Sequence, residues 1–347
     1  MMNGTQTVRK DDASSAQAMD EEMDTMSYTP VQELQRHGIA AGDIKKLQEH
    51  GINTVNALSQ TSRRKLVMIK GLSEAKCEKM FEIAEKVAPV SAFQSGKLLH
   101  EHRQANLFRI TTGGSELDKM LGGGVETGSI TELNGEYRVG KSQICMTLAV
   151  ASQMPEELGG GEGRALIFDT EGTFRPERVL EIASRFDLNG EDVLDNLQIA
   201  RIYTPDHLEK ALVKASALLV QEEYRILIID SIIAPFRFEY CGRGELAERQ
   251  QRLGAILVTL KKMADEFNLA VVLTNQVCAD PGAMAAFVPD AKKAVGGHVL
   301  AHAVDTRIQL RKGKGDQRVA KIIDSPWRAE QEAVYTIGPG GIIDATD

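Results

Sequence analysis

The sequence predicts an α/β protein with a mostly parallel, twisted sheet, preceded by a small all-helical domain. From Phe108 onward, short apolar runs alternate with helical patterns, which is typical of parallel strands covered on both faces. Between residues 31 and 87, apolar residues recur at helical spacing and glycines interrupt them. A chain of 347 residues, 42% of them hydrophobic, is long enough for one large core and one smaller domain.

We expect an acidic tail over 1–27, a helical domain over 28–88, a linker over 89–107 and the α/β core over 108–347. The tail has few apolar residues and a composition typical of disorder; its carboxylates are Asp11, Asp12, Asp20, Glu21, Glu22 and Asp24. A net charge of −8 argues against a protein that coats DNA through a generally basic surface, although a local DNA site remains compatible with it.

Neither a membrane segment nor a secretory signal is predicted. No apolar run approaches the ~20 residues that span a bilayer, and the N-terminus lacks the basic and then apolar pattern of a signal peptide. We therefore expect a protein of the cytosol or nucleus with no membrane partner. The four cysteines are widely spaced and predict ordinary reduced thiols, not a metal or redox pair.

The helical domain is expected to hold about five short helices. Two of its glycine turns, Glu49–Thr54 and Ile69–Lys76, precede helices and expose backbone N–H groups that suit a phosphate. The second resembles a helix-hairpin-helix element, which grips the DNA backbone. Lys70 and Gly71 are its candidate DNA contacts, with Lys76 in support. The alternative is a plain corner in a small helical core.

The strands and helices of the core alternate along the chain. Apolar runs predict strands at 130–133, 165–168, 197–202, 226–229, 270–274, 306–310, 320–323 and 333–337. Helical patterns predict helices at 142–153, 176–186, 205–221 and 245–267. In such sheets, ligands lie beyond the carboxyl ends of the strands.

A glycine-bounded loop follows the first of these strands and precedes a helix, which is the context of a phosphate-binding P-loop. Backbone N–H groups of the loop and of the helix N-terminus would surround phosphate oxygens. Lys141 would reach the β- and γ-phosphates, and the Ser142 hydroxyl would ligate Mg²⁺. The nucleotide-binding candidates are Gly135, Glu136, Tyr137, Arg138, Val139, Gly140, Lys141, Ser142 and, directly after them, Gln143.

Polar residues follow three further strands, where phosphoryl transfer needs them. Asp230 fits the carboxylate that holds Mg²⁺ through its water shell. Glu171 is the candidate that orients and polarises the attacking water. Gln276 is the candidate that senses the γ-phosphate and signals its presence to the residues after it. The alternative for each residue is a strand-end cap or a solvated turn residue.

Two polar connections leave the same end of the predicted sheet. One runs from Arg237 to Arg243, and the other from Val277 to Gly297 with no clear element. The second holds Lys292 and Lys293, and its Gly296-Gly297 pair precedes a predicted helix, an arrangement suited to phosphate. Basic loops beside a nucleotide site favour a grip on single-stranded DNA. The alternatives are a small-molecule lid or simple surface loops.

Several blocks together resemble the eukaryotic and archaeal RecA-type recombinases, from about Val31 to the C-terminus. The blocks are Gly135–Ser142, Leu166–Arg178, Leu227–Ser231, Gly242–Gln250 and Gly296–His302. The resemblance implies a RecA-type P-loop ATPase core behind a helix-hairpin-helix-like domain. The stretches 60–64, 70–76 and 279–283 lean toward the meiotic member of that family, with its mitotic sister second. The alternatives are a recombinase paralogue acting as a non-hydrolysing mediator, and a ring-forming RecA-fold helicase or nucleotide-switched regulator. The intact Lys141, Ser142, Glu171, Asp230 and Gln276 argue against the first, and the helical domain and the Phe93 linker argue against the second.

The resemblance implies a homo-oligomer, a helical filament or a ring, that binds ATP and Mg²⁺ between subunits in the nucleus. The filament would form on single-stranded DNA, pair with homologous duplex and exchange strands during meiotic recombination and double-strand break repair, with help from mediator proteins. By similarity, Arg237, Arg243 and Arg249 serve a first DNA loop, and Val277–Val295 forms a second. Gly296 and Gly297 would contact DNA phosphates, His302 would couple the γ-phosphate to DNA, and Arg178 would stack on the adenine.

In the same family a linker Phe-x-x-Ala motif inserts into the adjacent subunit, a head-to-tail contact that builds open helices. Here the motif reads Phe93-Gln94-Ser95-Gly96, so the alanine methyl is missing. Weaker filaments, or a greater dependence on loading proteins, are expected. Three further departures are Val139 for threonine, Ala329 for proline and Asp305 for a small hydroxyl residue. We expect Val139 to have little effect, Ala329 to change packing near the adjacent adenine, and Asp305 to alter the link between nucleotide and DNA.

Overall fold

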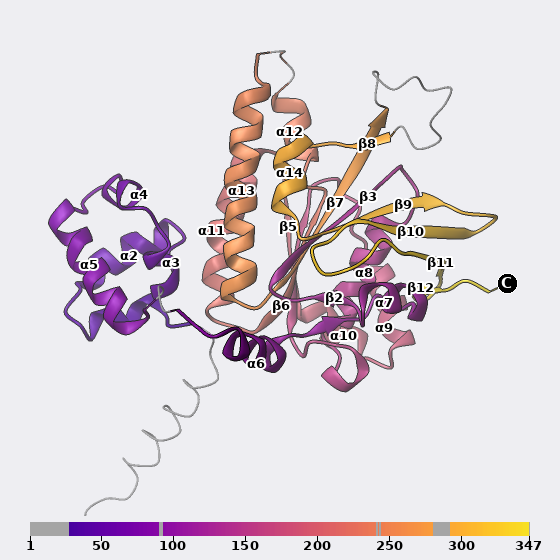
Figure 1. The fold of residues 1–347 in the computed structure, drawn as a ribbon, viewed down its shortest axis with the longest axis horizontal. Helices are drawn as coiled ribbons and strands as arrows, with labels where there is room; N and C mark the ends of the chain where they lie inside the picture. The colour runs from indigo at the N-terminus through magenta and orange to yellow at the C-terminus, as the bar shows by residue number, and fades with distance from the viewer. Residues whose placement is uncertain (1–27, 90–92, 241, 243, 280–291, 347) are drawn as a thin grey trace, which may run out of the picture.

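A computed structural model of the chain describes residues 28–89, 93–240, 242, 244–279 and 292–346. The predicted acidic tail therefore lies outside the described residues. The helical domain consists of η1 (Val31–Gln35), α2 (Ala41–Glu49), α3 (Val55–Ser59), α4 (Arg63–Val67) and α5 (Glu74–Val87), around a core of its own (Figure 1). Hydroxyl side chains start three of these helices, because Thr54, Ser62 and Ser73 each accept a backbone N–H three residues ahead.

The segment expected as a linker contains a helix, α6 (Gly96–Asn106), which the sequence reading missed. The Ser95 hydroxyl accepts the Leu98 N–H at 3.2 Å and caps its first turn. Among the residues of α6 none is buried, and its two leucines, Leu98 and Leu99, are both exposed.

The core contains a 10-stranded sheet with the order β12-β11-β10-β9-β3-β7-β6-β4-β5, and β8 pairs with β7 off this path. Strands β9, β3, β7, β6, β4 and β5 pair in parallel. The remaining pairs are antiparallel. The strands span β3 (Ser129–Gly135), β4 (Arg164–Asp169), β5 (Leu197–Arg201), β6 (Tyr224–Asp230), β7 (Ala270–Ala279), β8 (Lys292–Ala294), β9 (Thr306–Lys312), β10 (Gln317–Asp324), β11 (Glu332–Gly338) and β12 (Gly341–Asp344).

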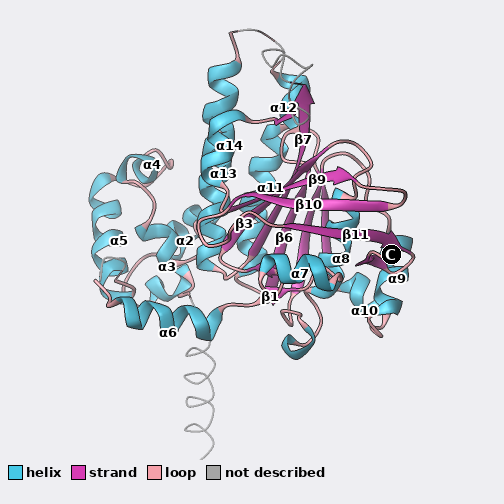
Figure 2. Cartoon of the chain, turned by 45° about the vertical axis from the view of Figure 1, so that its right-hand side comes forward, coloured by secondary structure: helices cyan, strands magenta, loops and turns pink. Residues whose placement is uncertain are grey.

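Helices cover both faces of this sheet, as the sequence predicts (Figure 2). On β6, Ile226 and Ile228 join one hydrophobic core, while Leu227 and Ile229 join the other, because successive side chains of a strand point to opposite faces. The first core includes α8 (Lys141–Ala151) and α9 (Pro176–Arg185), and the second includes α11 (Pro205–Leu219) and α13 (Leu246–Glu266). The smaller elements are β1 (Arg109–Ile110), α7 (Ser115–Leu121), β2 (Val125–Glu126), η2 (Glu156–Leu158), α10 (Gly190–Asp195), α12 (Ala234–Glu239) and α14 (Gly297–Ala303).

Both polar connections contain helix or strand residues that the sequence did not predict. Strand β7 runs through Asn275 and Gln276 to Ala279, and β8 pairs antiparallel with its end, so the connection begins and ends as a hairpin. Arg237 lies in α12 and not in a loop. Residues 280–291 and Arg243 lie outside the described residues. The carboxyl end of β7, α12 and the start of α13 share one end of the molecule (Figures 1 and 2).

The helical domain contacts α11 and α13 through polar groups. The Asn53 amide donates to Ser216 Oγ at 2.8 Å, the Thr54 hydroxyl donates to Glu266, and the Tyr28 hydroxyl donates to the Leu219 carbonyl at 3.0 Å. Gly51 lies against α11, where an added Cβ would stand 3.3 Å from Val213. The first glycine turn is therefore occupied by the core domain, and the expectation that it presents N–H groups to a phosphate is wrong.

Within the described part of the chain, no helix combines the length and the apolar character needed to cross a bilayer.

Candidate nucleotide-binding site

The register of the parallel strands brings the polar strand ends to one edge of the sheet. Gly135 of β3 lies opposite Gln276 of β7, and Asp169 of β4 lies opposite Asp230 of β6. The loop after Gly135 is therefore adjacent to the carboxyl ends of β6 and β7. Its position follows from the rule that carboxyl ends of parallel strands share an edge.

The loop at 135–142 has the backbone shape that turns N–H groups inward. Arg138 has a φ of 64° and Gly140 a φ of 102°, both in the left-handed region. Gly140 is the N-cap of α8, and a Cβ there would lie 2.8 Å from Ile337 Cδ1, so only glycine fits without movement. The N-terminal turn of α8 points its unpaired N–H groups at the same space, which makes it suited to an anion.

A residue of strand β11 holds this loop by a hydrogen bond that the sequence did not predict. The buried Tyr335 hydroxyl donates to the Val139 carbonyl at 2.8 Å. Burial raises the pKa of this phenol, so it remains a neutral donor. The two residues are 196 positions apart, and nothing local in the sequence marks the tyrosine as a partner of the loop. Val139 itself is fully buried.

Lys141 directs its ammonium into the loop. Its Nζ donates to the carbonyls of Gly135 at 3.0 Å and Glu136 at 2.7 Å. Burial lowers the pKa of Lys141, and the nearby carboxylates of Asp230 and Glu171 oppose that effect. The ammonium is thus held beside the loop N–H groups, where a phosphate would add the negative charge that this position lacks.

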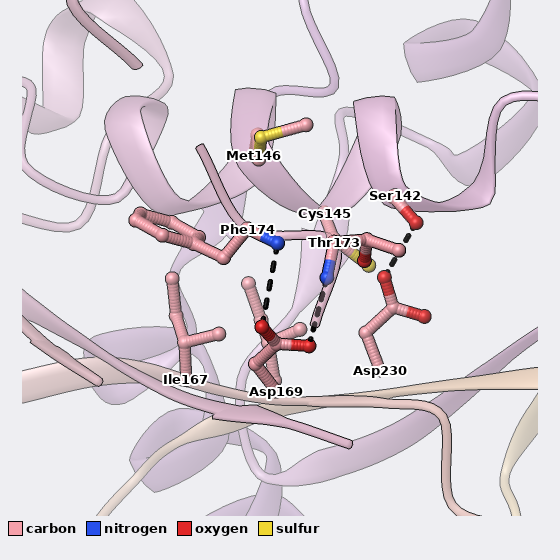
Figure 3. A pocket seen from close by; sticks show the side chains of 9 residues that line it. Ser142, Cys145, Met146, Ile167, Asp169, Thr173, Phe174 and Asp230 are labelled. Atoms are coloured by element: carbon pink, nitrogen blue, oxygen red, sulfur yellow. Dashed lines mark hydrogen bonds between the residues drawn. The ribbon is translucent and has the colours of Figure 1, made fainter. Parts of the chain in front are cut away.

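Ser142 and Asp230 form the oxygen pair expected at a magnesium site (Figure 3). Ser142 Oγ lies 2.5 Å from Asp230 Oδ2, and Thr274 Oγ1 lies 2.5 Å from Asp230 Oδ1. Burial raises the pKa of Asp230, and the two hydroxyl donors act against that rise. Hydroxyl and carboxylate oxygens are ligands that Mg²⁺ accepts, and they line a pocket with Cys145 and Thr173.

Glu171, Gln276 and Arg237 form one hydrogen-bonded chain. Glu171 Oε1 accepts from Ser231 Oγ at 3.0 Å and from Gln276 Nε2 at 2.8 Å. Gln276 Oε1 accepts from Arg237 Nη2 at 2.6 Å. The structure thus brings together two strand-end residues and an arginine of α12. Both the amide nitrogen and the amide oxygen of the Gln276 side chain form hydrogen bonds.

A second chain, absent from the sequence reading, begins at a buried glutamate in the middle of the sheet. Glu132 of β3 is fully buried and accepts from Arg307 Nε at 2.6 Å and from the Asn275 amide at 2.7 Å. The same amide donates to the Val295 carbonyl at 2.6 Å, and the Val295 N–H donates to the Gln276 carbonyl at 3.0 Å. The signal available in the sequence was an acidic residue inside an apolar strand, since such a group is rarely buried unpaired.

Other predicted site residues lie around this edge or away from it. Arg178 is held by Gln143 Oε1 at 2.8 Å and by the carbonyls of Gly338 and Pro339. Gly296 is the N-cap of α14, and Gly297 is its first residue. His302 is exposed on α14 and stacks on His298 at 6.0 Å between ring centroids. The backbone of Lys292 and Lys293 lies in β8, and Arg249 is half-buried on α13.

Lys70 and Gly71 are exposed in the helical domain, and the Lys46 ammonium donates to the Gly71 carbonyl at 3.0 Å. They contact neither the loop at 135–142 nor the Glu171 chain, so they belong to a separate surface.

Asp305 lies at the edge of the sheet opposite the loop at 135–142. It precedes β9 at the amino ends of the strands, accepts the Ile130 N–H at 2.8 Å and pairs with Lys261 at 2.8 Å. The loop at 135–142 lies at the opposite, carboxyl edge. Asp305 therefore does not contact that loop, and in the structure it binds β3 and α13 together. Its effect on the link between nucleotide and DNA stays a prediction.

Comparison with known proteins gives a consistent set of relatives. Residues 103–345 match the protein family described as Rad51. The chain is 50% identical to "DNA repair protein RAD51" of Mycosarcoma maydis over 318 residues, 92% of this chain and 93% of the relative. It is 50% identical to "Meiotic recombination protein DMC1 homolog" of Lilium longiflorum over 327 residues, 94% and 93% of the two chains. It is 46% identical to "DNA repair protein RAD51 homolog 1" of Arabidopsis thaliana over 334 residues, 96% and 97%.

Proposed function

Because this chain belongs to the Rad51 family, and so is a RecA-type strand-exchange recombinase and a DNA-dependent ATPase, we propose that the cluster at the carboxyl edge of its sheet is the ATP site. The loop at 135–142 and Lys141 bind the phosphates. Ser142 and Asp230 hold Mg²⁺, which draws charge from the phosphate oxygens when bound. Glu171 orients the attacking water and accepts its proton, at a position beside the Ser231 hydroxyl.

The observation that supports this assignment is the connection between the site and the two segments, α12 and β8, to which we assign DNA contacts. Gln276 contacts Glu171 on one side and Arg237 of α12 on the other. Its backbone also pairs with Val295, directly before the Gly296-Gly297 turn. A ligand that moves Glu171 or Gln276 therefore moves α12 and β8 together. This is a two-way coupling between nucleotide and DNA, because linkage between binding sites is reciprocal.

DNA contacts are assigned to the same end of the molecule. Arg237, Arg243, Arg249, Lys292 and Lys293 supply positive charge for the backbone of single-stranded DNA. Gly296 and Gly297 offer backbone N–H groups to a phosphate, and His302 on α14 couples that contact to the nucleotide. Lys70 and Gly71 of the helical domain bind duplex backbone, and Arg178 lies beside Gln143, where the adenine is placed.

Assembly is assigned to Phe93 and a pocket on the core. Phe93 is fully exposed, which is unusual for a large apolar residue. Beside edge strand β5, a pocket of about 460 Å³, here called the edge pocket, has an apolar floor that includes Leu166 and Phe168. Phe93 of one chain fills the edge pocket of the next. Such a contact is heterologous and generates a helical filament or, if it closes, a ring.

For the biological role we propose meiotic recombination and double-strand break repair in the nucleus, with mediator proteins that load the filament. The residues that support the meiotic assignment are Gln60–Arg64, Lys70–Lys76 and Ala279–Ala283. A disruption strain separates the roles. Meiotic arrest with normal mitotic resistance to radiation is expected, and radiation sensitivity with normal meiosis would assign the chain to the mitotic role.

The activity is tested by joint-molecule formation between homologous single-stranded and duplex DNA. We expect the purified chain to form joint molecules with ATP and Mg²⁺, and to lose them when ADP replaces ATP or when a chelator removes Mg²⁺. A heterologous duplex is the control for homology. Failure of the wild-type chain to form joint molecules, with ATPase intact, would leave a mediator role instead.

The Gly96→Ala variant is expected to assemble more tightly than wild type. An added Cβ at Gly96 meets no atom within 4 Å of its own chain, so the methyl is free to contact the neighbouring subunit. Burying one methyl contributes about 0.8 kcal/mol, which is about fourfold in the association constant. Sedimentation velocity and filament lengths in electron micrographs measure the change.

The matched control is Gly42→Ala, an exposed helical glycine whose added Cβ also meets nothing within 4 Å. It separates the interface methyl from the general gain in helix propensity. Equal assembly of Gly96→Ala and wild type, or an equal gain in Gly42→Ala, would contradict the proposed role of the missing methyl.

A further inference from the structure

The outer face of α11 carries charges of both signs, and its two lysines lie at the edge pocket. Its acidic residues, Asp206 and Glu209, both pair with Arg252 of α13, which also pairs with Glu239. The hydrogen bond from Arg252 lowers the pKa of Asp206, and the positive charge of Lys210 contributes to this lowering. Lys210 and Lys214 are exposed, line the edge pocket and form no ion pair with any described residue. They are one helical turn apart, so their ammonium groups lie on the same face. The edge pocket thus has a basic rim above an apolar floor.

Phe93 does not account for these lysines. From Pro89 to Lys97 the linker has no carboxylate, so a neighbouring chain that inserts Phe93 brings no negative charge from that segment. Ile199 of β5 is also 45% exposed at the pocket. The pocket therefore suits a second occupant with an apolar side chain between carboxylates.

The chain itself contains such a segment, in the sequence Asp20-Glu21-Glu22-Met23-Asp24. Its attachment point is adjacent to the pocket. The Tyr28 hydroxyl donates to the carbonyl of Leu219, the residue after the pocket-lining Leu218, and its ring packs on Phe267 at 4.9 Å between centroids. The tail thus leaves the described chain at the C-terminal end of α11, with the lysines along the same helix.

The span of the tail segment matches the distances along α11 from Leu219 to the two lysines. Along α11, Lys214 lies ~7.5 Å and Lys210 ~13.5 Å before Leu219, at 1.5 Å per residue. Between Tyr28 and Asp24, and between Tyr28 and Glu21, a flexible chain has a root-mean-square span of ~11 Å and ~15 Å. A tether whose span matches the distance gives an effective concentration in the millimolar range, so weak contacts suffice.

We propose that the acidic segment 20–24 docks on the edge pocket of its own chain, with its carboxylates on Lys210 and Lys214 and Met23 over the apolar floor. The tail then occupies the place that Phe93 of a neighbouring chain takes in the assembly. It weakens self-association until a neighbour or DNA displaces it. The competition with Phe93 rests on the assembly assigned above, whereas the docking itself does not.

The docking is tested in the full chain by photo-crosslinking from position 23. Met23→p-benzoylphenylalanine is irradiated in a mixture of isotope-labelled and unlabelled protein, and the linked peptides are identified by mass spectrometry. We expect links within one chain to β5 or α11, in particular near Ile199 and Ala211. The double variant Lys210→Glu, Lys214→Glu should lower their yield about fivefold, the change expected for two exposed ion pairs. Reversing Asp20, Glu21, Glu22 and Asp24 to lysine in that variant should restore it.

The matched control is Lys45→Glu, Lys86→Glu, which reverses two exposed helical lysines that also lack an ion pair in the described chain. Its cross-links should equal those of wild type. Links that map elsewhere, join two chains, or persist unchanged in Lys210→Glu, Lys214→Glu would overturn the proposal. The readout is independent of strand exchange, so failure of joint-molecule formation and failure of tail docking are distinguished.

Discussion

Replacement of Lys141 by alanine should abolish joint-molecule formation at ATP concentrations that saturate the wild-type chain. The ammonium lies inside the loop, bonded to the carbonyls of Gly135 and Glu136. A charge-assisted donor to phosphate is among the stronger hydrogen bonds in proteins. Its loss from a preorganised site costs about 10²–10³-fold in rate. We expect ATP hydrolysis to fall by at least that factor, measured as phosphate release in the presence of single-stranded DNA.

Two further variants make this result interpretable. Lys141→Met keeps the length of the side chain and removes only the charge, so it separates the lost ammonium from a cavity in the loop. Lys45→Ala removes an exposed lysine of the helical domain and should behave as wild type. Normal joint molecules from both Lys141 variants would contradict the role of ATP as the switch of the filament.

Replacement of Glu171 by glutamine should reduce ATP hydrolysis by about 10²–10⁴-fold while ATP binding persists, because general base catalysis contributes that much. Glutamine has nearly the same shape, and its amide oxygen still accepts from Ser231 Oγ and Gln276 Nε2. It cannot take a proton from water. With ATP retained, joint molecules should form and persist longer than in the wild type.

The comparison is made by phosphate release together with binding of a fluorescent ATP analogue. Glu177→Gln, an exposed glutamate at the start of α9, is the matched control and should hydrolyse ATP normally. Hydrolysis by Glu171→Gln within a factor of about three of the wild-type rate, well short of the loss expected for a removed base, would assign the proton transfer to another group. Loss of ATP binding in the same variant would make Glu171 a structural partner of Gln276.

The strand ends were predictable because their signal is local. Asp230 follows an aliphatic run, Glu171 follows another, and the glycine-bounded loop follows a third. The rule that carboxyl ends of parallel strands share an edge then places them together, and their register in the sheet agrees. The structure of the polar connections was not predicted, because it depends on contacts that are not local. The pairing of β7 with β8 joins residues well separated in sequence, so no local pattern predicts it.

The supports of the site were not predictable. Tyr335 holds the loop from 196 residues away, and Arg307 neutralises Glu132 from 175 residues away. A sequence window shows neither partner, because each contact depends on which strands become neighbours. Asp305 shows that closeness in the sequence does not by itself predict a place at the same edge of the sheet. It lies three residues after His302 in the sequence, yet it binds the amino end of β3, away from the nucleotide edge.

The sequence by itself determined that this chain has an α/β core with a phosphate-binding loop, a helical domain before it, and carboxylates at successive strand ends. Those features depend on local composition and periodicity, which each segment carries independently of the others. Only the tertiary structure decided that Gln276 bridges Glu171 to Arg237, that Glu132 is paired inside the sheet, and that Lys210 and Lys214 line the pocket at β5. These depend on strand order and register, which arise when segments distant in the chain pack and pair.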